Sequence, residues 1–314
     1  MQPRSPRTAG LRPYVHPDTL AHRRAHRRAS GRAHGFTLVE LTVAIVLLGI
    51  VALMVTGFTT GAMQSYIDAE RRAQLADTTE TAMRRMQRDL RLSLPNSVRI
   101  TSSGSTIYLE FLPVVAGGRY RAQLAGATPP GSCGVGWNDV LNIGTADSDF
   151  TTIGPVPDLN SLIGNGYYVV VYNLGAGFTQ ADAYASGAAT GGNKSVLLKH
   201  TTNTCERRII ISTTTFTLAS PSNRFHVVQG PVTYACNLAS GQLSRYSGYS
   251  IAAAQPTPPA GTPALMLDNV SSCTMTYDPN AISQRIGVVS IALARSVAGE
   301  SVRLYQDVRV DNAP

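Results

Sequence analysis

The chain has 314 residues, of which 43% are apolar, enough for one large or two modest folded domains and too many for a disordered protein. Its net charge of +8 would suit nucleic acid or an anionic membrane, but eight arginines and only one acid, Asp18, precede Gly35. Removing these from the totals of 27 basic and 19 acidic residues leaves +1 for the remaining chain, so we expect no nucleic-acid partner.

Residues 1–35 have the composition of a basic targeting leader. They hold four of the six histidines together with the eight arginines, and they show no apolar period that could bury a core. Positively charged flanks of membrane helices tend to stay in the cytoplasm. We therefore expect a cytoplasmic N-terminus and a C-terminal part beyond the inner membrane.

An apolar run follows the leader. Residues 41–58 are eighteen residues without a charge, near the lower limit for a helix that spans a bilayer. We assign residues 36–61 to the membrane-spanning half of a long helix. The alternative is a plain signal anchor, a membrane helix with no further role.

One carboxylate, Glu40, lies at the start of this run. An ionised acid within a bilayer costs about 2.5–3.5 kcal/mol even on mild insertion scales, so it is a functional hypothesis by default. The alternative is a helix-start residue near the headgroups, where the macrodipole favours an acid by about 0.3–1 kcal/mol.

Residues 62–94 predict the amphipathic half of the same helix. Apolar residues recur there at three- and four-residue steps among mixed charges, which indicates one buried stripe and a solvated or ion-paired face. Pro95 should end the helix, because proline cannot continue it. Gly57 and Gly61 form a weak patch between the two halves.

Residues 95–314 read as β-rich, with no repeat and no second domain boundary. Short β-branched or aromatic runs alternate with Gly- and Pro-rich joints, and the last two runs suggest a hairpin. One antiparallel sheet resting on the amphipathic helix is the simplest α+β architecture, with surface loops at 181–194 and 252–264. The runs are 105–115, 167–174, 207–213, 224–236, 287–295 and 301–310.

The cysteines predict disulfides. Their number is even, they lie in the segment expected outside the cytoplasm, and their spacings match no close-paired zinc pattern, so we expect no metal. Four cysteines allow three pairings. We favour Cys236–Cys273, because both lie in strand-like segments, which leaves Cys133–Cys205.

The sequence holds no enzymatic signature. The mature part has His200 and His226 as its histidines and lacks hydrolase, metalloprotease and C-x-x-C motifs. A phosphate-loop-like stretch has Asn193 where lysine is needed. Asp147 and Asp149 could help to bind calcium, but we favour the alternative, a solvated loop. We expect no catalytic residue and no cofactor, whereas an adhesin leaves no motif to test.

The stretch GFTLVE, residues 35–40, resembles the processing site of type IV prepilins and type II secretion pseudopilins when combined with the basic leader and the apolar run. The resemblance implies that a prepilin peptidase cuts between Gly35 and Phe36 and that Phe36 becomes an N-methylated N-terminus. It also implies that Glu40 meets the Phe36 amine of a neighbouring subunit. Glycine suits the cut because it has no Cβ.

Further segments, among them LRLSLPNSVRI, FHVVQGPVTYAC and LDNVSSCTMTYDP, are similar to minor pilins of the MshO type from the mannose-sensitive haemagglutinin (MSHA) pilus, and more loosely to the J class of pseudopilins. This similarity implies a pilin-like fold, with a periplasmic globular domain at residues 95–314. It implies a non-enzymatic subunit that passes from the inner membrane into a pilus at the cell surface. Its partners would be the major pilin, other minor pilins and the inner-membrane assembly platform.

Overall fold

The computed structural model describes residues 35–124, 139–164, 166–178, 180–185, 192–202, 207–283 and 285–314, and the structural statements below concern these residues. The chain divides into two compact units, residues 1–61 and residues 62–314, each considered by itself. The predicted α+β class is confirmed: a long N-terminal apolar helix continues into a segment packed against antiparallel sheets.

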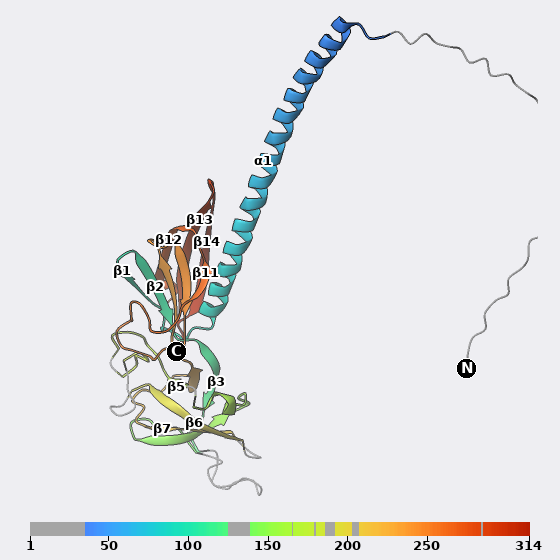
Figure 1. Cartoon of the computed structure of the whole chain (residues 1–314). Helices are drawn as coiled ribbons and strands as arrows, with labels where there is room; N and C mark the ends of the chain where they lie inside the picture. The colour runs from blue at the N-terminus through green and yellow to red at the C-terminus, as the bar shows by residue number, and fades with distance from the viewer. Residues whose placement is uncertain are drawn as a thin grey trace, which may run out of the picture. The chain divides into compact units, whose positions relative to one another are not determined.

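The helix, α1 (Leu38–Arg91), contributes to both units (Figure 1). It runs without a break through Gly57 and Gly61. In the second unit one stripe of α1 is buried, and its members recur at the three- and four-residue steps that the sequence predicts. They are Leu75, Thr79, Ala82, Met83, Met86 and Leu90.

The end of α1 differs from the prediction. The helix stops at Arg91, before the limit at residue 94 that Pro95 suggested. The backbone N–H of Leu94 donates instead to the carbonyl of Leu112 at 2.7 Å. Tertiary pairing therefore ends the helix earlier than proline alone requires.

The strands form two open sheets and one closed barrel in the described part of the chain, so the prediction of a single sheet is wrong. The first sheet has the order β1-β2-β9-β10-β11, with β1 (Arg99–Ser103), β2 (Thr106–Phe111), β9 (Val232–Asn237), β10 (Gln242–Tyr246) and β11 (Ala264–Leu267). The second contains β12 (Val270–Ser283), β13 (Ile286–Val297) and β14 (Glu300–Asp311). The barrel has the order β3-β4-β7-β6-β5-β8, with β3 (Val114–Tyr120), β4 (Asp147–Ile153), β5 (Tyr168–Val171), β6 (Lys194–Thr202), β7 (Arg207–Thr214) and β8 (Arg224–Val228).

The predicted strand runs are confirmed as strands. Each of them overlaps at least one strand, and run 224–236 overlaps both β8 and β9. The predicted closing hairpin is β13–β14, paired without a register shift from Ile286↔Asp311 to Val297↔Glu300. Alternate side chains of β13 are buried, as one face of a half-buried strand requires.

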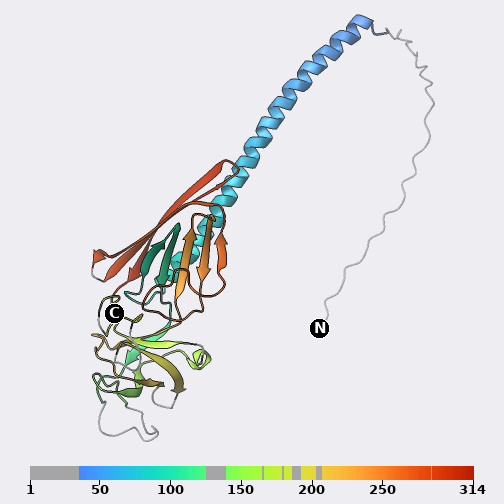
Figure 2. The same cartoon turned by 60° about the vertical axis from the view of Figure 1, so that its left-hand side comes forward.

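One core joins α1 to both open sheets. Met83, Met86 and Leu90 from the helix pack in the same cluster as Leu109 and Phe111 of β2. Residues from β9 to β14 complete this cluster, including the alternating buried positions Val289, Ile291 and Leu293. Figures 1 and 2 show β1, β2 and β11 to β14 alongside the second half of α1. We call α1 from residue 62 and these two sheets the body.

The barrel has a core of its own. Phe150 meets Tyr120 and Phe225 edge to face, with ring centroids 6.5 and 5.4 Å apart. Val169, Ile209, Val227 and further apolar residues from the six strands fill the remaining space. Such edge-to-face pairs add about 0.5–1.5 kcal/mol each beyond area burial, so the barrel interior is well packed.

Hydrogen bonds from asparagine side chains connect the body to the barrel. Asn96, just past α1, donates through Nδ2 to the carbonyl of Asn173 beyond β5 at 2.9 Å and to that of Asn312 after β14 at 3.2 Å. Asn173 donates back to the carbonyl of Pro95 at 2.7 Å. The end of the helix, the barrel and the second sheet therefore meet at one hydrogen-bonded junction.

A buried ion pair lies nearby. Arg99 of β1 donates through Nε to Glu110 of β2 at 2.8 Å, and the Glu110 side chain is fully buried. Tyr249 and Thr233 also donate to this carboxylate, at 2.9 and 3.2 Å. The ring of Tyr184, from the predicted loop 181–194, lies 3.6 Å from the Arg99 guanidinium. The loop is confirmed as a segment without strands up to Asn193 among its described residues, yet it carries a buried anchor.

The junction provides a matched pair of glycine variants. Gly175 and Gly177 have φ of +92° and +90°, so alanine strains the backbone similarly at both, by about 1–2 kcal/mol. A Cβ at Gly175 would lie 2.7 Å from the carbonyl oxygen of Asn96, whereas nothing lies within 4 Å at Gly177. We expect Gly175→Ala to lower the free energy of unfolding by clearly more than Gly177→Ala in urea titrations. Equal losses would contradict the close approach at the junction.

Candidate processing and assembly site

The predicted cleavage residues lie just before α1. Gly35 and Phe36 are outside the helix, and Phe36 is exposed. The hydroxyl of Thr37 accepts a hydrogen bond from the backbone N–H of Glu40 at 3.2 Å. Thr37 is therefore the N-cap of α1, in the T-x-x-E pattern of a capping box. This pattern was readable in the sequence, but the role of Thr37 was not predicted.

Glu40 lies in the first turn of α1. Glu40 is exposed, and no ion pair in the described ranges involves its carboxylate. The unpaired N–H groups of a first helical turn attract a negative charge, so the position suits a carboxylate. The same exposure leaves the carboxylate available to a positive group from another molecule. The structure thus accommodates both readings of Glu40 given above.

The first half of α1 is apolar on every side. Its large side chains are exposed, among them Leu41, Ile45, Leu48 and Val55. An apolar 18-residue stretch of this helix has none of its residues buried, so its length and composition allow it to cross a membrane. A helix that is apolar all round needs an apolar surrounding, either lipid or other helices.

One cysteine pair is placed in the structure. Cys236 of β9 and Cys273 of β12 form a disulfide with their Cα atoms 6.6 Å apart, and this bond links the first sheet to the second. Cys133 and Cys205 lie outside the described residues, so their predicted pairing stays a prediction.

The candidate calcium ligands are engaged in the fold. Asp147 and Asp149 lie on β4 rather than in the solvated loop that we predicted. Asp147 accepts from the backbone N–H of Asn142 at 2.7 Å, and Asp149 accepts from Arg208 at 2.5 Å. Burial, helped by a hydrogen bond and repulsion from Asp149, raises the pKa of Asp139 to about 7. Within the described residues, no cluster of His, Cys, Asp and Glu has the arrangement of a metal site.

The histidines that an enzyme might use lie in the barrel. His200 on β6 is buried, and its Nδ1 accepts from the backbone N–H of Leu159 at 3.1 Å. Burial lowers the pKa of His226 on β8. These side chains therefore lie on packed barrel strands rather than in the open cleft that a general base needs.

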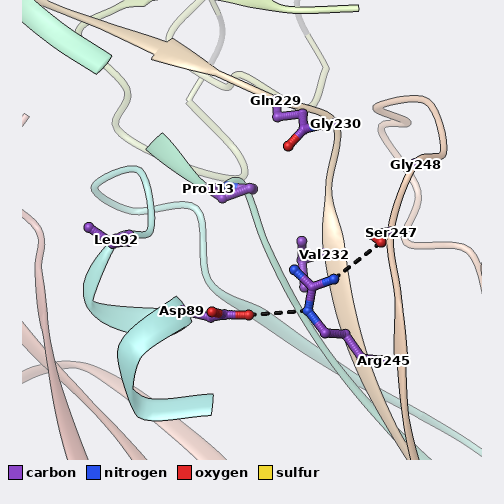
Figure 3. Close-up of a pocket in the computed structure, with 9 residues that line it drawn as sticks. All are labelled: Asp89, Leu92, Pro113, Gln229, Gly230, Val232, Arg245, Ser247 and Gly248. Carbon is purple, nitrogen blue, oxygen red and sulfur yellow. Dashed lines mark hydrogen bonds and ion pairs between the residues drawn. The ribbon is translucent and has the colours of Figure 1, made fainter. Parts of the chain in front are cut away.

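A pocket of about 250 Å³ lies between the end of α1 and the first sheet (Figure 3). Asp89 and Arg245 form an ion pair on its wall, with Nε and Oδ2 3.1 Å apart, and Arg245 also donates to Ser247. Gln229 and Gly230 lie on the other side of the pocket, close to Pro113. The lining has no nucleophile paired with a base, so it supports no hydrolytic chemistry.

Comparison with known proteins identifies the N-terminal segment. The family profile described as "Prokaryotic N-terminal methylation motif" matches residues 30–56. No curated protein and no solved structure gives a significant match. The matched residues include Gly35, Phe36 and Glu40 together with most of the apolar run. Residues 30–56 thus carry the N-terminal methylation motif that is found in type IV pilins and pseudopilins.

Proposed function

We propose that this protein is a minor pilin of an MSHA-like type IV pilus, cut by prepilin peptidase and built into the filament. The observation that carries the proposal is the arrangement at the start of α1. Gly35 and Phe36 belong to the methylation motif and lie just before the capped start of α1. A lone carboxylate, Glu40, is exposed in the first turn of this helix.

The proposed chemistry begins with removal of residues 1–35. Cleavage after Gly35 frees the amine of Phe36, which stays positively charged when it is methylated. In an apolar surrounding this cation and a neighbour's Glu40 attract each other strongly, because the effective dielectric constant is far below that of water. Each pairing sets two opposite charges that are costly in lipid against each other, which favours the docked over the separate subunit.

The proposed location and partners follow from the same residues. The apolar half of α1 holds the subunit in the inner membrane, with the body and the barrel in the periplasm, before it enters the pilus. The major pilin, other minor pilins and the assembly platform are then its partners. The competing assignments are a J-class pseudopilin of type II secretion and a pilus-displayed adhesin. Neighbouring genes separate the two systems, and binding of the purified globular part to glycans would favour the adhesin.

Processing is tested at Gly35. Gly35→Val adds a β-branched side chain where the peptidase must approach the backbone, so we expect an uncut precursor that keeps its first 35 residues. Immunoblots of membrane fractions measure the mass. Mature-length protein from this variant would refute the assigned cut.

Assembly is tested at Glu40. Glu40→Gln keeps the shape of the side chain but loses its charge, and a charge-assisted hydrogen bond contributes about 1.5–3 kcal/mol, so we expect roughly tenfold or greater loss from pili. Membrane level and cleavage should stay unchanged. The ratio of protein in sheared pili to protein in membranes is measured in a strain that lacks the native copy. Glu70→Gln, an exposed change farther along the same helix, is the control. Equal incorporation of both variants would contradict charge pairing.

A further inference from the structure

We propose that the barrel is structurally separable from the part of the chain that assembles into the filament, an inference that rests on the proposed function. Residues 36–111 and 232–314 form a complete filament subunit. Residues 112–231 are an inserted module that assembly does not need.

The ends of the insertion meet in the first sheet. β2 and β9 are neighbours there, and their register pairs Phe111 directly with Val232. The chain therefore leaves the sheet after Phe111 and re-enters it opposite the same residue. The backbone N–H of Gln229 also donates to the carbonyl of Pro113 at 3.3 Å, so the two connecting segments run side by side. A short hairpin loop can span this gap, because directly paired residues need only two to five residues to connect them.

The two cores share no residue. Every buried member of the cluster that packs against α1 lies before residue 112 or after residue 231. Every buried member of the barrel cluster lies between these limits. Likewise, the barrel strands pair only with one another in the described part of the chain. Removing the barrel therefore opens no cavity in the core of the body, and such cavities are what make core changes costly.

The contacts between body and barrel lie at the junction and beside the buried ion pair, where the ring of Tyr184 covers Arg99 and its hydroxyl donates to the carbonyl of Ser97 at 2.9 Å. A small cluster brings Leu94 of the body against barrel residues such as Val170 and Val228. The pocket of Figure 3 separates the connecting segments at Pro113 and Gly230 from Asp89 and Arg245 of the body. In both views of the molecule the barrel strands lie past the C-terminal end of α1, not along the helix (Figures 1 and 2). The barrel thus leaves uncovered the side of α1 that the sheets do not bury.

A pair of matched substitutions tests the proposal in the full-length membrane protein. Phe225→Asp places a charge in the barrel core, and Phe111→Asp places one in the core of the body; both side chains are fully buried. The Cys236–Cys273 disulfide lies wholly in the body and reports on its folding by non-reducing peptide mapping. A third variant replaces residues 113–230 by a short Gly-Ser loop.

We expect Phe225→Asp to make the barrel protease-sensitive while the disulfide still forms and incorporation into sheared pili stays within about twofold of wild type. The loop variant should behave in the same way, and Phe111→Asp should lose both the disulfide and incorporation. The proposal is overturned if Phe225→Asp loses the disulfide, or if it keeps the disulfide but drops out of pili. Absence of the wild-type protein from pili would overturn the proposed function instead, and the disulfide measurement would then decide whether the barrel is separable.

Discussion

Arg99→Met is expected to lower the free energy of unfolding by about 3–5 kcal/mol, among the largest effects of any single substitution in this chain. The substitution leaves the fully buried carboxylate of Glu110 with hydroxyl donors alone, from Thr233 and Tyr249. Methionine keeps much of the apolar stem of arginine, so the loss reports on the guanidinium, which also donates to the carbonyls of Ala252 and Ala253. Urea titration of the globular part, followed by circular dichroism, measures it.

Two further variants separate the buried charge from a surface ion pair. Adding Glu110→Gln to Arg99→Met should recover part of the loss, because the double variant no longer buries an unpaired charge. Arg84→Met removes an exposed pair with Glu80 and should change stability by less than about 0.5 kcal/mol. If Arg99→Met were as mild as Arg84→Met, the pair would contribute no more than a surface ion pair.

Removing the Cys236–Cys273 disulfide is expected to have the second large effect. The bond closes a loop with a sequence separation of 37 residues, for which the chain-entropy relation gives roughly 4 kcal/mol. We expect the double variant Cys236→Ala with Cys273→Ala to unfold at a correspondingly lower urea concentration. Cys236→Ala alone should match it, because either change breaks the bond. A wild-type midpoint in the double variant would show that the first and second sheets need no covalent link.

The sequence predicts those elements of the fold that have local signals. The β13–β14 hairpin was found because both strands carry long alternating runs and the link between them is short. β1 was missed because its sequence, RITSS, is polar, and of β12 only the strand-like segment around Cys273 was predicted, because the strand also includes Asp278, Pro279 and Asn280. The barrel could not be predicted, since β-branched runs do not show which strands pair, and Phe111 and Val232 meet across a long insertion.

In the candidate site, too, the residues with a local sequence signal could be predicted and those without one could not. Gly35, Phe36 and Glu40 were predicted because they form one short motif. Thr37 carries a local capping signal too, which was overlooked. Asp147 was misread as solvated because nothing local reveals that β4 lies in a barrel wall. Arg99 and Glu110 face each other only through the β1–β2 register, so their pairing depended on a strand that was not predicted.

The cap at Thr37 affects how easily a protease can reach the peptide bond that precedes the helix. Proteases generally hold their substrates in an extended conformation, and a scissile bond inside a helix must first be unwound. Each helical hydrogen bond broken in that step costs about 0.5–1.5 kcal/mol. Because α1 begins only at Leu38, the bond between Gly35 and Phe36 is already outside the helix. Under the proposed processing, the peptidase would therefore act on the anchored precursor without melting the helix that holds it in the membrane.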